Sequence, residues 1–166
     1  MTVDNNKLVK IAIITLSDRA FRGDYEDKSG PKIIDYLRSH YQEKMTYDYF
    51  LLPDDETKLL EILEKVTTED YQFVYTTGGT GISPRDITVD TVAKFSDKLL
   101  PGIMDYIRVK YGAINPNALL SRSVTAIKNN TIIFTLPGST KAVDEYMTEI
   151  LKVVDHMLKM IKGEGH

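Results

Sequence analysis

The amino-acid sequence predicts an α/β fold built on a mostly parallel sheet with helices on both faces. Segments typical of strands and of helices alternate along the chain, which is the order that such sheets require. The first segment, residues 9–16 (VKIAIITL), is β-branched and almost continuously apolar, as expected of a central strand covered on both sides. The chain has 166 residues and shows no repeat, linker or shift in composition, so we expect a single domain, 1–166.

Apolar spacing predicts the next two helices and the strand between them. Gly30 and Pro31 open the first helix, because proline is tolerated in the first helical turn. Its apolar residues recur at helical spacing: Ile33, Ile34, Leu37 and Tyr41. Residues then alternate in the strand pattern at Tyr47, Tyr49 and Leu51. The second helix is amphipathic and carries Leu59, Leu60, Leu63 and Val66.

A third strand at 72–76 leads into a glycine-rich loop, and further helical patterns follow. One short helix is indicated by Val89, Val92 and Ala93. Another, ended by Gly112, is indicated by Ile103, Tyr106, Ile107 and Tyr111. Residues 124–136 have the pattern of two strands joined at Asn129-Asn130, a pair that tolerates the positive φ of a tight hairpin.

A last helix is expected to begin near Ser139 and to run to Ile161. Its apolar residues form one stripe: Val143, Tyr146, Met147, Ile150, Leu151, Val154, Met157, Leu158 and Ile161. Because amphipathic helices are the rule in globular proteins, this stripe indicates core packing rather than a cofactor site.

Composition excludes several classes of function. The absence of cysteine excludes disulfides, thiolate metal sites and cysteine nucleophiles. The three histidines, His40, His156 and His166, are scattered and do not predict a zinc site. A formal net charge of −3 gives no reason to expect nucleic-acid binding, which favours basic surfaces. No apolar stretch approaches the roughly 20 residues that span a bilayer. The polar start, residues 1–10, is unlike a signal peptide, so we expect a cytoplasmic protein.

Polar clusters follow the predicted strands at the points where the strands end. They are Ser17-Asp18-Arg19, Pro53-Asp54-Asp55, the loop 76–86 and Pro137-Gly138-Ser139-Thr140-Lys141. In parallel α/β sheets, ligands bind outside the carboxyl ends of the strands. The clusters therefore predict one shared site at that edge of the sheet.

The loop 76–86 (TTGGTGISPRD) has the chemistry of a phosphate site. Its glycines, Gly78, Gly79 and Gly81, carry no side chain that would keep a ligand from the backbone. Such a loop can wrap a phosphate with main-chain N–H groups, and Arg85 offers a planar, bidentate contact. The loop matches neither the Walker A motif nor the dinucleotide glycine motif. A glycine–threonine turn is by itself often only structural.

Asp86 directly follows Arg85, and a carboxylate there opposes an anion unless a cation lies between them. Magnesium is commonly held by one or two carboxylates together with substrate phosphates. Asp54 and Asp86 both follow predicted strands and could converge on such an ion. The alternative role for Asp54-Asp55 is a helix N-cap, which fits Asp55 better because it stands closer to the helix.

Other strand-end residues have two interpretations each. Ser17-Asp18-Arg19 is either a simple turn or a source of a phosphate contact from Arg19. Asp27-Lys28-Ser29-Gly30 is either a solvated loop or a source of a phosphate contact from Lys28. Ser139 is either an ordinary N-cap or part of an anion site at a helix N-terminus.

Together these motifs resemble the molybdopterin-binding domain of the MoaB/Mog family of molybdenum cofactor biosynthesis proteins. The resemblance covers roughly residues 9–161 and keeps the family's order and spacing. Its most specific part is TTGGTG at 76–81 with Pro84-Arg85-Asp86 behind it. The other parts are Ser17-Asp18-Arg19, Asp27-Lys28-Ser29-Gly30-Pro31, Pro53-Asp54, Pro101-Gly102, Leu120-Ser121-Arg122 and Leu136-Pro137-Gly138-Ser139.

The resemblance implies a three-layer α/β/α sandwich and the activity of molybdopterin adenylyltransferase, an enzyme related to the G domain of gephyrin. Such an enzyme uses ATP and Mg²⁺ to form adenylylated molybdopterin and pyrophosphate. Asp54 and Asp86 match the two acidic catalytic positions of the family and would hold the Mg²⁺. Contacts to molybdopterin or ATP are implied for Ser17, Asp18, Arg19, Lys28, Ser29, Thr77, Gly78, Gly79, Thr80, Gly81, Arg85, Pro101, Gly102, Ser121, Arg122, Pro137, Gly138, Ser139 and Lys141.

Three alternatives to the enzyme remain open at the level of sequence. The first is a MoaB-type protein that binds molybdopterin without adenylylating it, although the presence of both Asp54 and Asp86 favours the enzyme. The second is an assembly module like gephyrin, which requires linker and partner domains. The third is a generic nucleotide-binding protein. The resemblance further implies a homotrimer, with a hexamer as the alternative, and a downstream molybdenum-inserting protein as a partner.

Overall fold

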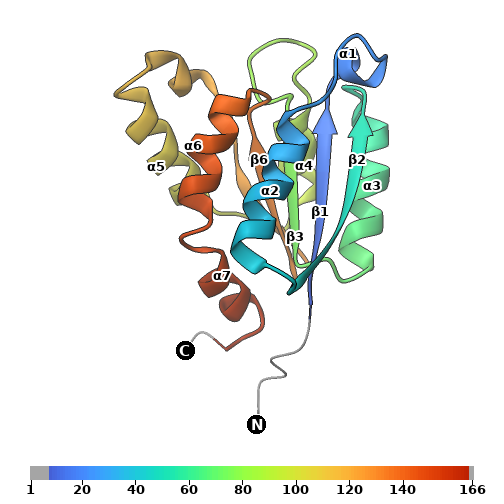
Figure 1. Cartoon of the computed structure of the whole chain (residues 1–166), viewed down its shortest axis with the longest axis vertical. Coiled ribbons are helices and arrows are strands. Elements are labelled where there is room, and N and C mark those ends of the chain that lie inside the picture. The colour runs from blue at the N-terminus through green and yellow to red at the C-terminus, as the bar shows by residue number, and fades with distance from the viewer. Residues whose placement is uncertain (1–7, 165–166) are drawn as a thin grey trace.

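The computed structural model describes residues 8–164 and has the predicted α/β architecture (Figure 1). A six-stranded sheet has the order β2-β1-β3-β6-β5-β4. The strands are β1 (Val9–Leu16), β2 (Met45–Leu52), β3 (Phe73–Thr77), β4 (Lys98–Leu99), β5 (Thr125–Lys128) and β6 (Thr131–Leu136). The pairs among β2, β1, β3 and β6 are parallel, while β5 pairs with β6 and with β4 in antiparallel fashion. The prediction of a mostly parallel sheet is confirmed.

Helices cover both faces of this sheet, which makes the predicted three layers (Figure 1). One face carries α2 (Ser29–Tyr41), α5 (Pro101–Gly112), α6 (Thr140–Ile150) and α7 (Val154–Ile161). The other face carries α3 (Glu56–Thr68) and α4 (Thr88–Phe95). Successive residues of a strand point to opposite faces, so Ile13 packs into the first core and Ile14 into the second. Both are fully buried, and this explains why β1 is apolar without alternation.

Some local predictions hold and others miss short elements. Asn129, with φ of +52°, forms the turn between β5 and β6, as the Asn129-Asn130 pair predicts. Three elements were not predicted: α1 (Asp18–Phe21), β4 and the 3₁₀ helix η1 (Pro116–Leu120). Each spans five residues or fewer, which is too short for an apolar repeat to show.

The prediction of one continuous last helix is wrong. α6 ends at Ile150 and α7 begins at Val154, with a turn between them. The backbone amides of Lys152 and Val153 bond to the carbonyls of Glu149 and Ile150, three residues back, instead of four. The apolar stripe gave no sign of this break, because the residues beyond it still pack against the same core.

The carboxyl ends of the parallel strands meet at one edge of the sheet, the upper edge in Figure 1. There the backbone amide of Ser17 donates to the carbonyl of Leu52 (2.9 Å), and that of Gly78 donates to the carbonyl of Leu136 (3.0 Å). The strand-end clusters named above therefore lie beside one another. Within residues 8–164, every helix is too short or too polar to cross a membrane. The predictions for residues 1–7 and for His166 lie outside the described part of the chain.

Candidate active site

Asp18, Asp54 and Arg85 join the loops that follow β1, β2 and β3. The carboxylate of Asp18 accepts a hydrogen bond from the backbone amide of Asp54 (3.0 Å), and the carboxylate of Asp54 accepts one from the amide of Asp18 (3.1 Å). Arg85 donates from Nε (3.1 Å) and Nη2 (2.6 Å) to the other oxygen of Asp18. Arg85, predicted to contact phosphate, is thus paired with Asp18. We call these residues the Asp18–Asp54–Arg85 network.

The two carboxylates of this network have opposite pKa shifts. The hydrogen bond from Arg85 is the main cause that lowers the pKa of Asp18. Burial is the main cause that raises the pKa of Asp54, and the negative charges of Asp18 and Asp86 raise it further. Asp54 is also linked through Asp18 to Arg85, the residue before Asp86, so the loops that carry Asp54 and Asp86 lie side by side. A half-buried carboxylate beside two others is a place where a cation would be stabilised.

Asp86 shapes the loop in which it lies. Its Oδ2 accepts a hydrogen bond from the amide of Ser83 (2.9 Å), while its own amide donates to the carbonyl of Ser83 (2.9 Å). A β-carbon at Gly81 would lie 2.8 Å from the same Oδ2 atom. A side chain at Gly81 would therefore force the carboxylate of Asp86 to shift.

The other two glycines of the loop, Gly78 and Gly79, are required by packing inside the protein. Gly78 has φ of +95°, and a β-carbon there would lie 2.2 Å from the carbonyl oxygen of Leu16. Gly79 has φ of +69°, and a β-carbon there would lie 2.2 Å from Oγ1 of Thr88. These contacts give the glycines a role that does not depend on a ligand.

Arg122 and Ser121 brace the loop from the segment that follows η1. Arg122 donates to the carbonyls of Gly81 (2.8 Å) and Asp86 (3.0 Å), and its amide donates to the carbonyl of Thr80 (2.9 Å). The hydroxyl of Ser121 lies 3.4 Å from that of Thr80. The hydrogen-bonding groups of Arg122, predicted to contact substrate, are thus engaged within the protein.

Asp27, which was not predicted as a site residue, anchors the loop before α2. Its carboxylate accepts hydrogen bonds from the hydroxyls of Thr15 (2.8 Å), Tyr49 (2.6 Å) and Ser29 (2.9 Å). It also accepts hydrogen bonds from the backbone amides of Ser29 (3.1 Å) and Gly30 (3.1 Å), so it caps the N-terminus of α2. The predicted residue Ser29 is therefore buried and engaged with Asp27.

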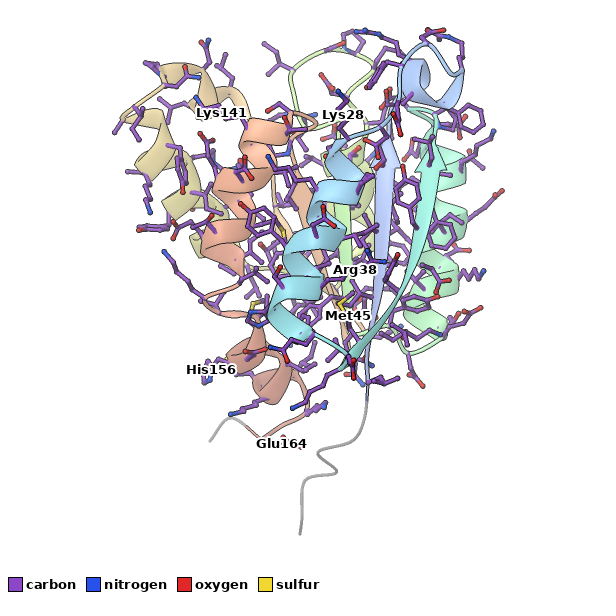
Figure 2. The ribbon with its side chains drawn as sticks, viewed as in Figure 1. Lys28, Arg38, Met45, Lys141, His156 and Glu164 are labelled. Carbon is purple, nitrogen blue, oxygen red and sulfur yellow. The ribbon has the colours of Figure 1, made fainter. Side chains whose placement is uncertain are left out.

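Two hollows flank the first turn of α6. One, of about 490 Å³, is lined by Tyr25, Glu26, Asp27, Lys28, Ser29, Gly138 and Thr140. The other, of about 190 Å³, includes Ser121, Pro137, Ser139, Lys141 and two asparagines, Asn115 and Asn117. Each hollow has one exposed lysine in its lining, Lys28 in the first and Lys141 in the second (Figure 2). Acidic residues line them too: Glu26 and Asp27 in the first, and Glu145, 3.9 Å from Lys141, in the second.

Three strand-end residues, Ser139, Asp55 and Ser17, are helix N-caps. The hydroxyl of Ser139 accepts the amide of Ala142 (3.1 Å), so it is an N-cap of α6. Asp55, rather than Asp54, caps α3 by accepting the amide of Lys58 (2.9 Å). Ser17 caps α1, and the guanidinium of Arg19 lies 5.0 Å from the ring of Tyr25.

Pro101 and Gly102 are not brought to this edge with the other predicted residues. They begin α5, and α5 reaches the site segment through Arg108, which donates to the carbonyl of Ser121 (3.4 Å). Arg108 lies six residues beyond Gly102 in the helix, or roughly 9 Å along the axis. Thr77 does lie at the site edge, but it is fully buried and donates its hydroxyl to the carbonyl of Pro137 (3.0 Å).

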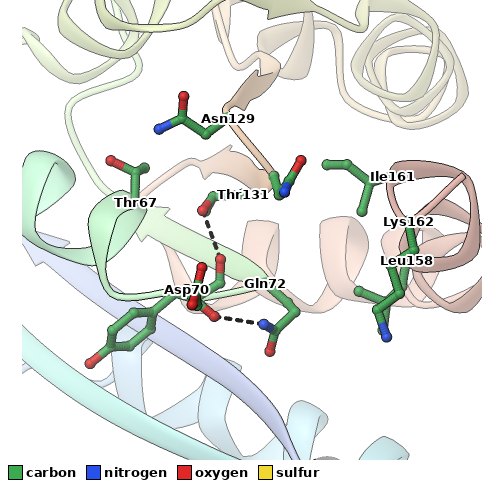
Figure 3. Close-up of a pocket in the computed structure, with 10 residues that line it drawn as sticks. Thr67, Asp70, Gln72, Asn129, Thr131, Leu158, Ile161 and Lys162 are labelled. Atoms are coloured by element: carbon green, nitrogen blue, oxygen red, sulfur yellow. Dashed lines mark hydrogen bonds between the residues drawn. The ribbon is translucent and has the colours of Figure 1, made fainter. Parts of the chain in front are cut away.

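A further polar hollow of about 240 Å³ lies at the opposite edge of the sheet (Figure 3). It is lined by Thr67, Asp70, Tyr71, Gln72, Asn129, Asn130, Thr131, Leu158, Ile161 and Lys162. None of the predicted site residues is among them. The concentration of strand ends and carboxylates therefore places the candidate site at the upper edge and not here.

The sequence and the fold were compared with those of known proteins. Residues 12–156 match the family described as a probable molybdopterin binding domain. The chain belongs to this family. Within the molybdopterin-binding family, it is 36% identical over 158 residues to the molybdopterin adenylyltransferase of Pyrococcus furiosus, with 92% of this chain and 91% of that protein covered. Its identity to the Helicobacter pylori molybdopterin adenylyltransferase is 33% over 157 residues, covering 93% and 89%.

Gephyrin of Dictyostelium discoideum is 30% identical over 162 residues, covering 93% of this chain, but the chain spans only 23% of gephyrin's length. Two solved structures support the same fold. MoaB of Thermus thermophilus superposes with a TM-score of 0.85 at 30% identity, covering 94% of this chain and 98% of that one. The tungsten cofactor synthesizing protein MoaB of Pyrococcus furiosus has a TM-score of 0.81 at 32% identity, with the same coverages. The predicted family and fold are confirmed.

Proposed function

We propose that the chain is a molybdopterin adenylyltransferase, which transfers the adenylyl group of ATP to molybdopterin and releases pyrophosphate. The observation that carries the proposal is the hydrogen-bonded chain from Asp54 through Asp18 to Arg85, the residue before Asp86, at the strand-end edge. The relatives named as molybdopterin adenylyltransferases, which match most of this chain, support it.

The proposed step is a direct transfer to phosphorus. An oxygen of the terminal phosphate of molybdopterin forms a bond to the α-phosphorus of ATP. The bond from that phosphorus to the oxygen bridging to the β-phosphate breaks, and its electron pair leaves with pyrophosphate. No protein nucleophile takes part, so the chain contributes positioning and charge stabilisation. Lys28, Lys141 and the N-terminus of α6 are the proposed contacts for the phosphates.

Magnesium fits the donor set at the proposed site. Within the described residues, no group of three or more His, Cys, Asp or Glu side chains could hold a metal by itself. Mg²⁺ is usually held by one or two carboxylates together with substrate phosphates. Asp54 and Asp86 are the proposed ligands, since each has one carboxylate oxygen that accepts no hydrogen bond from residues 8–164. When bound, Mg²⁺ supplies positive charge against the phosphate oxygens.

We further propose that the protein is a cytoplasmic homotrimer that passes its product to a molybdenum-inserting protein. Support for self-association comes from apolar side chains exposed on α5, η1 and the turn between them: Tyr106, Val109, Ile114, Leu119 and Leu120. Groups of this kind mark interaction surfaces.

Two variants test the proposed function. Asp54→Asn and Asp86→Asn should each lower the rate of adenylyl transfer at least about 100-fold while molybdopterin binding, followed by calorimetry, stays within a few-fold. The reason is that both carboxylates act on charge at the reacting phosphates and not on the pterin. Product formed at the normal rate by both variants would contradict the assignment of Asp54 and Asp86 as catalytic residues. A wild-type protein that binds molybdopterin but forms no product would indicate the MoaB-type binding protein instead.

A further inference from the structure

The segment Gly81–Asp86 belongs to no helix or strand, and its two ends are held by a single side chain. Nε of Arg122 donates to the carbonyl of Gly81 (2.8 Å), and Nη2 donates to the carbonyl of Asp86 (3.0 Å). One guanidinium therefore closes a six-residue loop across its first and last residues. We call this arrangement the Arg122 clamp.

The third nitrogen of the guanidinium is also engaged. Nη1 donates to both carboxylate oxygens of Asp90 (2.9 and 3.1 Å). Asp90 lies in the first turn of α4, directly beyond the loop, so the carboxylate orients the guanidinium from the helix side. Arginine is suited to this task because its planar fork holds several donors at fixed angles, whereas a lysine ammonium is a point charge on a flexible stem.

The clamp bears directly on Asp86. The carboxylate of Asp86 lies against Gly81, where an added β-carbon would be 2.8 Å from Oδ2, and it accepts the amide of Ser83. The direction of the carboxylate thus depends on how closely the two ends of the loop approach, and this approach is what Arg122 fixes. A misplacement of about 1 Å at a catalytic group can cost 100-fold in rate.

We infer that Arg122 is a positioning residue for Asp86 and not a direct contact to molybdopterin or ATP. This inference rests on the proposed function, in which Asp86 acts at the reacting phosphates. It predicts that changes at Arg122 reach catalysis only through the loop.

The test compares Arg122→Lys with Arg38→Lys, which makes the same chemical change at a guanidinium that donates to Tyr47 (2.7 Å), away from the strand-end edge. Each variant is measured for kcat and KM of adenylyl transfer, and for hydrogen exchange of the amides at 81–87. Arg122→Lys should lower kcat about 10- to 100-fold, keep KM for molybdopterin within about twofold, and raise exchange at 81–87 about tenfold. Arg38→Lys should change neither.

A double variant separates positioning from a general loss of structure. If Arg122 acts through Asp86, then Arg122→Lys added to Asp86→Asn should make the residual single-turnover rate no slower than that of Asp86→Asn alone. Asp90→Asn, which changes a carboxylate whose hydrogen bonds from residues 8–164 all come from Arg122, should raise exchange at 81–87 by about threefold. It provides the same comparison if the lysine variant does not fold.

Several results would overturn the inference. A raised KM with unchanged kcat in Arg122→Lys would make Arg122 a substrate contact. If the rate losses of Arg122→Lys and Asp86→Asn multiplied in the double variant, Arg122 would not act through Asp86. If Arg122→Lys exchanged its amides at 81–87 at the wild-type rate, the Arg122 clamp would not hold the loop. If the wild-type protein formed no adenylylated product, the proposed function would fail by itself. The exchange comparison would then still decide whether Arg122 holds the loop.

Discussion

Asp18 and Asp54 exchange hydrogen bonds, because each carboxylate accepts the backbone amide of the other residue, at 3.0 and 3.1 Å. The exchange ties the end of β1 to the end of β2. It also sets a carboxylate with a lowered pKa beside one with a raised pKa. The charge of Asp18 is paired with Arg85. Burial and the charges of Asp18 and Asp86 oppose the charge of Asp54. The charged form of Asp54 is therefore the destabilised one of the pair, as is typical of carboxylates at functional sites.

Asp54→Asn should leave the free protein as stable as wild type or more stable by up to about 1 kcal/mol at pH 7. Because the folded state raises the pKa of Asp54, its charge opposes folding above that pKa, and the opposition disappears once the carboxylate is protonated. The stability gain of Asp54→Asn should thus shrink as the pH falls below the raised pKa of Asp54 in the folded state. Urea unfolding at pH 7 and at pH 4 measures this. A variant much less stable than wild type at pH 7 would show that Asp54 is a structural residue.

Asp18→Asn should destabilise the protein at neutral pH by less than about 1 kcal/mol, since Arg85 is well exposed and its pairing is screened by water. The folded state lowers the pKa of Asp18 below its usual 3.8, so the stabilisation is present above the unfolded value and is lost as the pH falls through the folded one. Wild type and variant should therefore converge as the pH falls below the lowered pKa of Asp18. A stability difference that does not change between pH 7 and pH 3 would contradict the ion pair as its cause.

Gly79→Ala should destabilise the protein by about 2–4 kcal/mol, because the position needs φ of +69° and the new methyl group would meet Oγ1 of Thr88 at 2.2 Å. Gly102→Ala is the matched control, since nothing lies within 4 Å of its added methyl group. Alanine there, in the first turn of α5, should be neutral or stabilising by about 0.5–1 kcal/mol. Thermal unfolding measures both, and equal effects would contradict the packing described for the loop.

Glu149→Gln should cost about 1–3 kcal/mol at pH 7. The carboxylate is buried on α6 and accepts Lys110 of α5 (2.5 Å) and Lys152 (2.7 Å), which lower its pKa from 4.5. The stabilisation is therefore present above about pH 4.5 and lost as the pH falls through the lowered value. Denaturant unfolding as a function of pH checks this. Adenylyl transfer should be unchanged, and a loss of activity without a loss of stability would count against a purely structural role.

The fold was predictable because its signals are local. The continuous apolar run of β1, the helical spacing in α2 and α3, and the Asn129-Asn130 turn each reflect a few neighbouring residues. The break after Ile150 was not predictable, because no glycine or proline marks it and α7 packs against the same core.

The position of the candidate site at the ends of the strands was predictable, but its side-chain contacts were not. Asp54 and Asp86 follow strands that end at one edge, so the topology brought them together. The pairing of Arg85 with Asp18 joins residues 67 positions apart, and that of Arg122 with Gly81 joins residues 41 apart. Such contacts depend on side-chain directions that one sequence does not encode locally. Asp27 was missed for the same reason, since its partners Thr15 and Tyr49 come from two separate strands.

The most direct test of the central claim follows the α-phosphate of ATP. The protein is incubated with molybdopterin, Mg²⁺ and ATP radiolabelled at the α-phosphate, and the pterin and pyrophosphate are then separated and counted. We expect label on the pterin, an equal amount of pyrophosphate, and loss of both when a chelator removes Mg²⁺. Bound molybdopterin that gains no label in the presence of ATP and Mg²⁺ would contradict it.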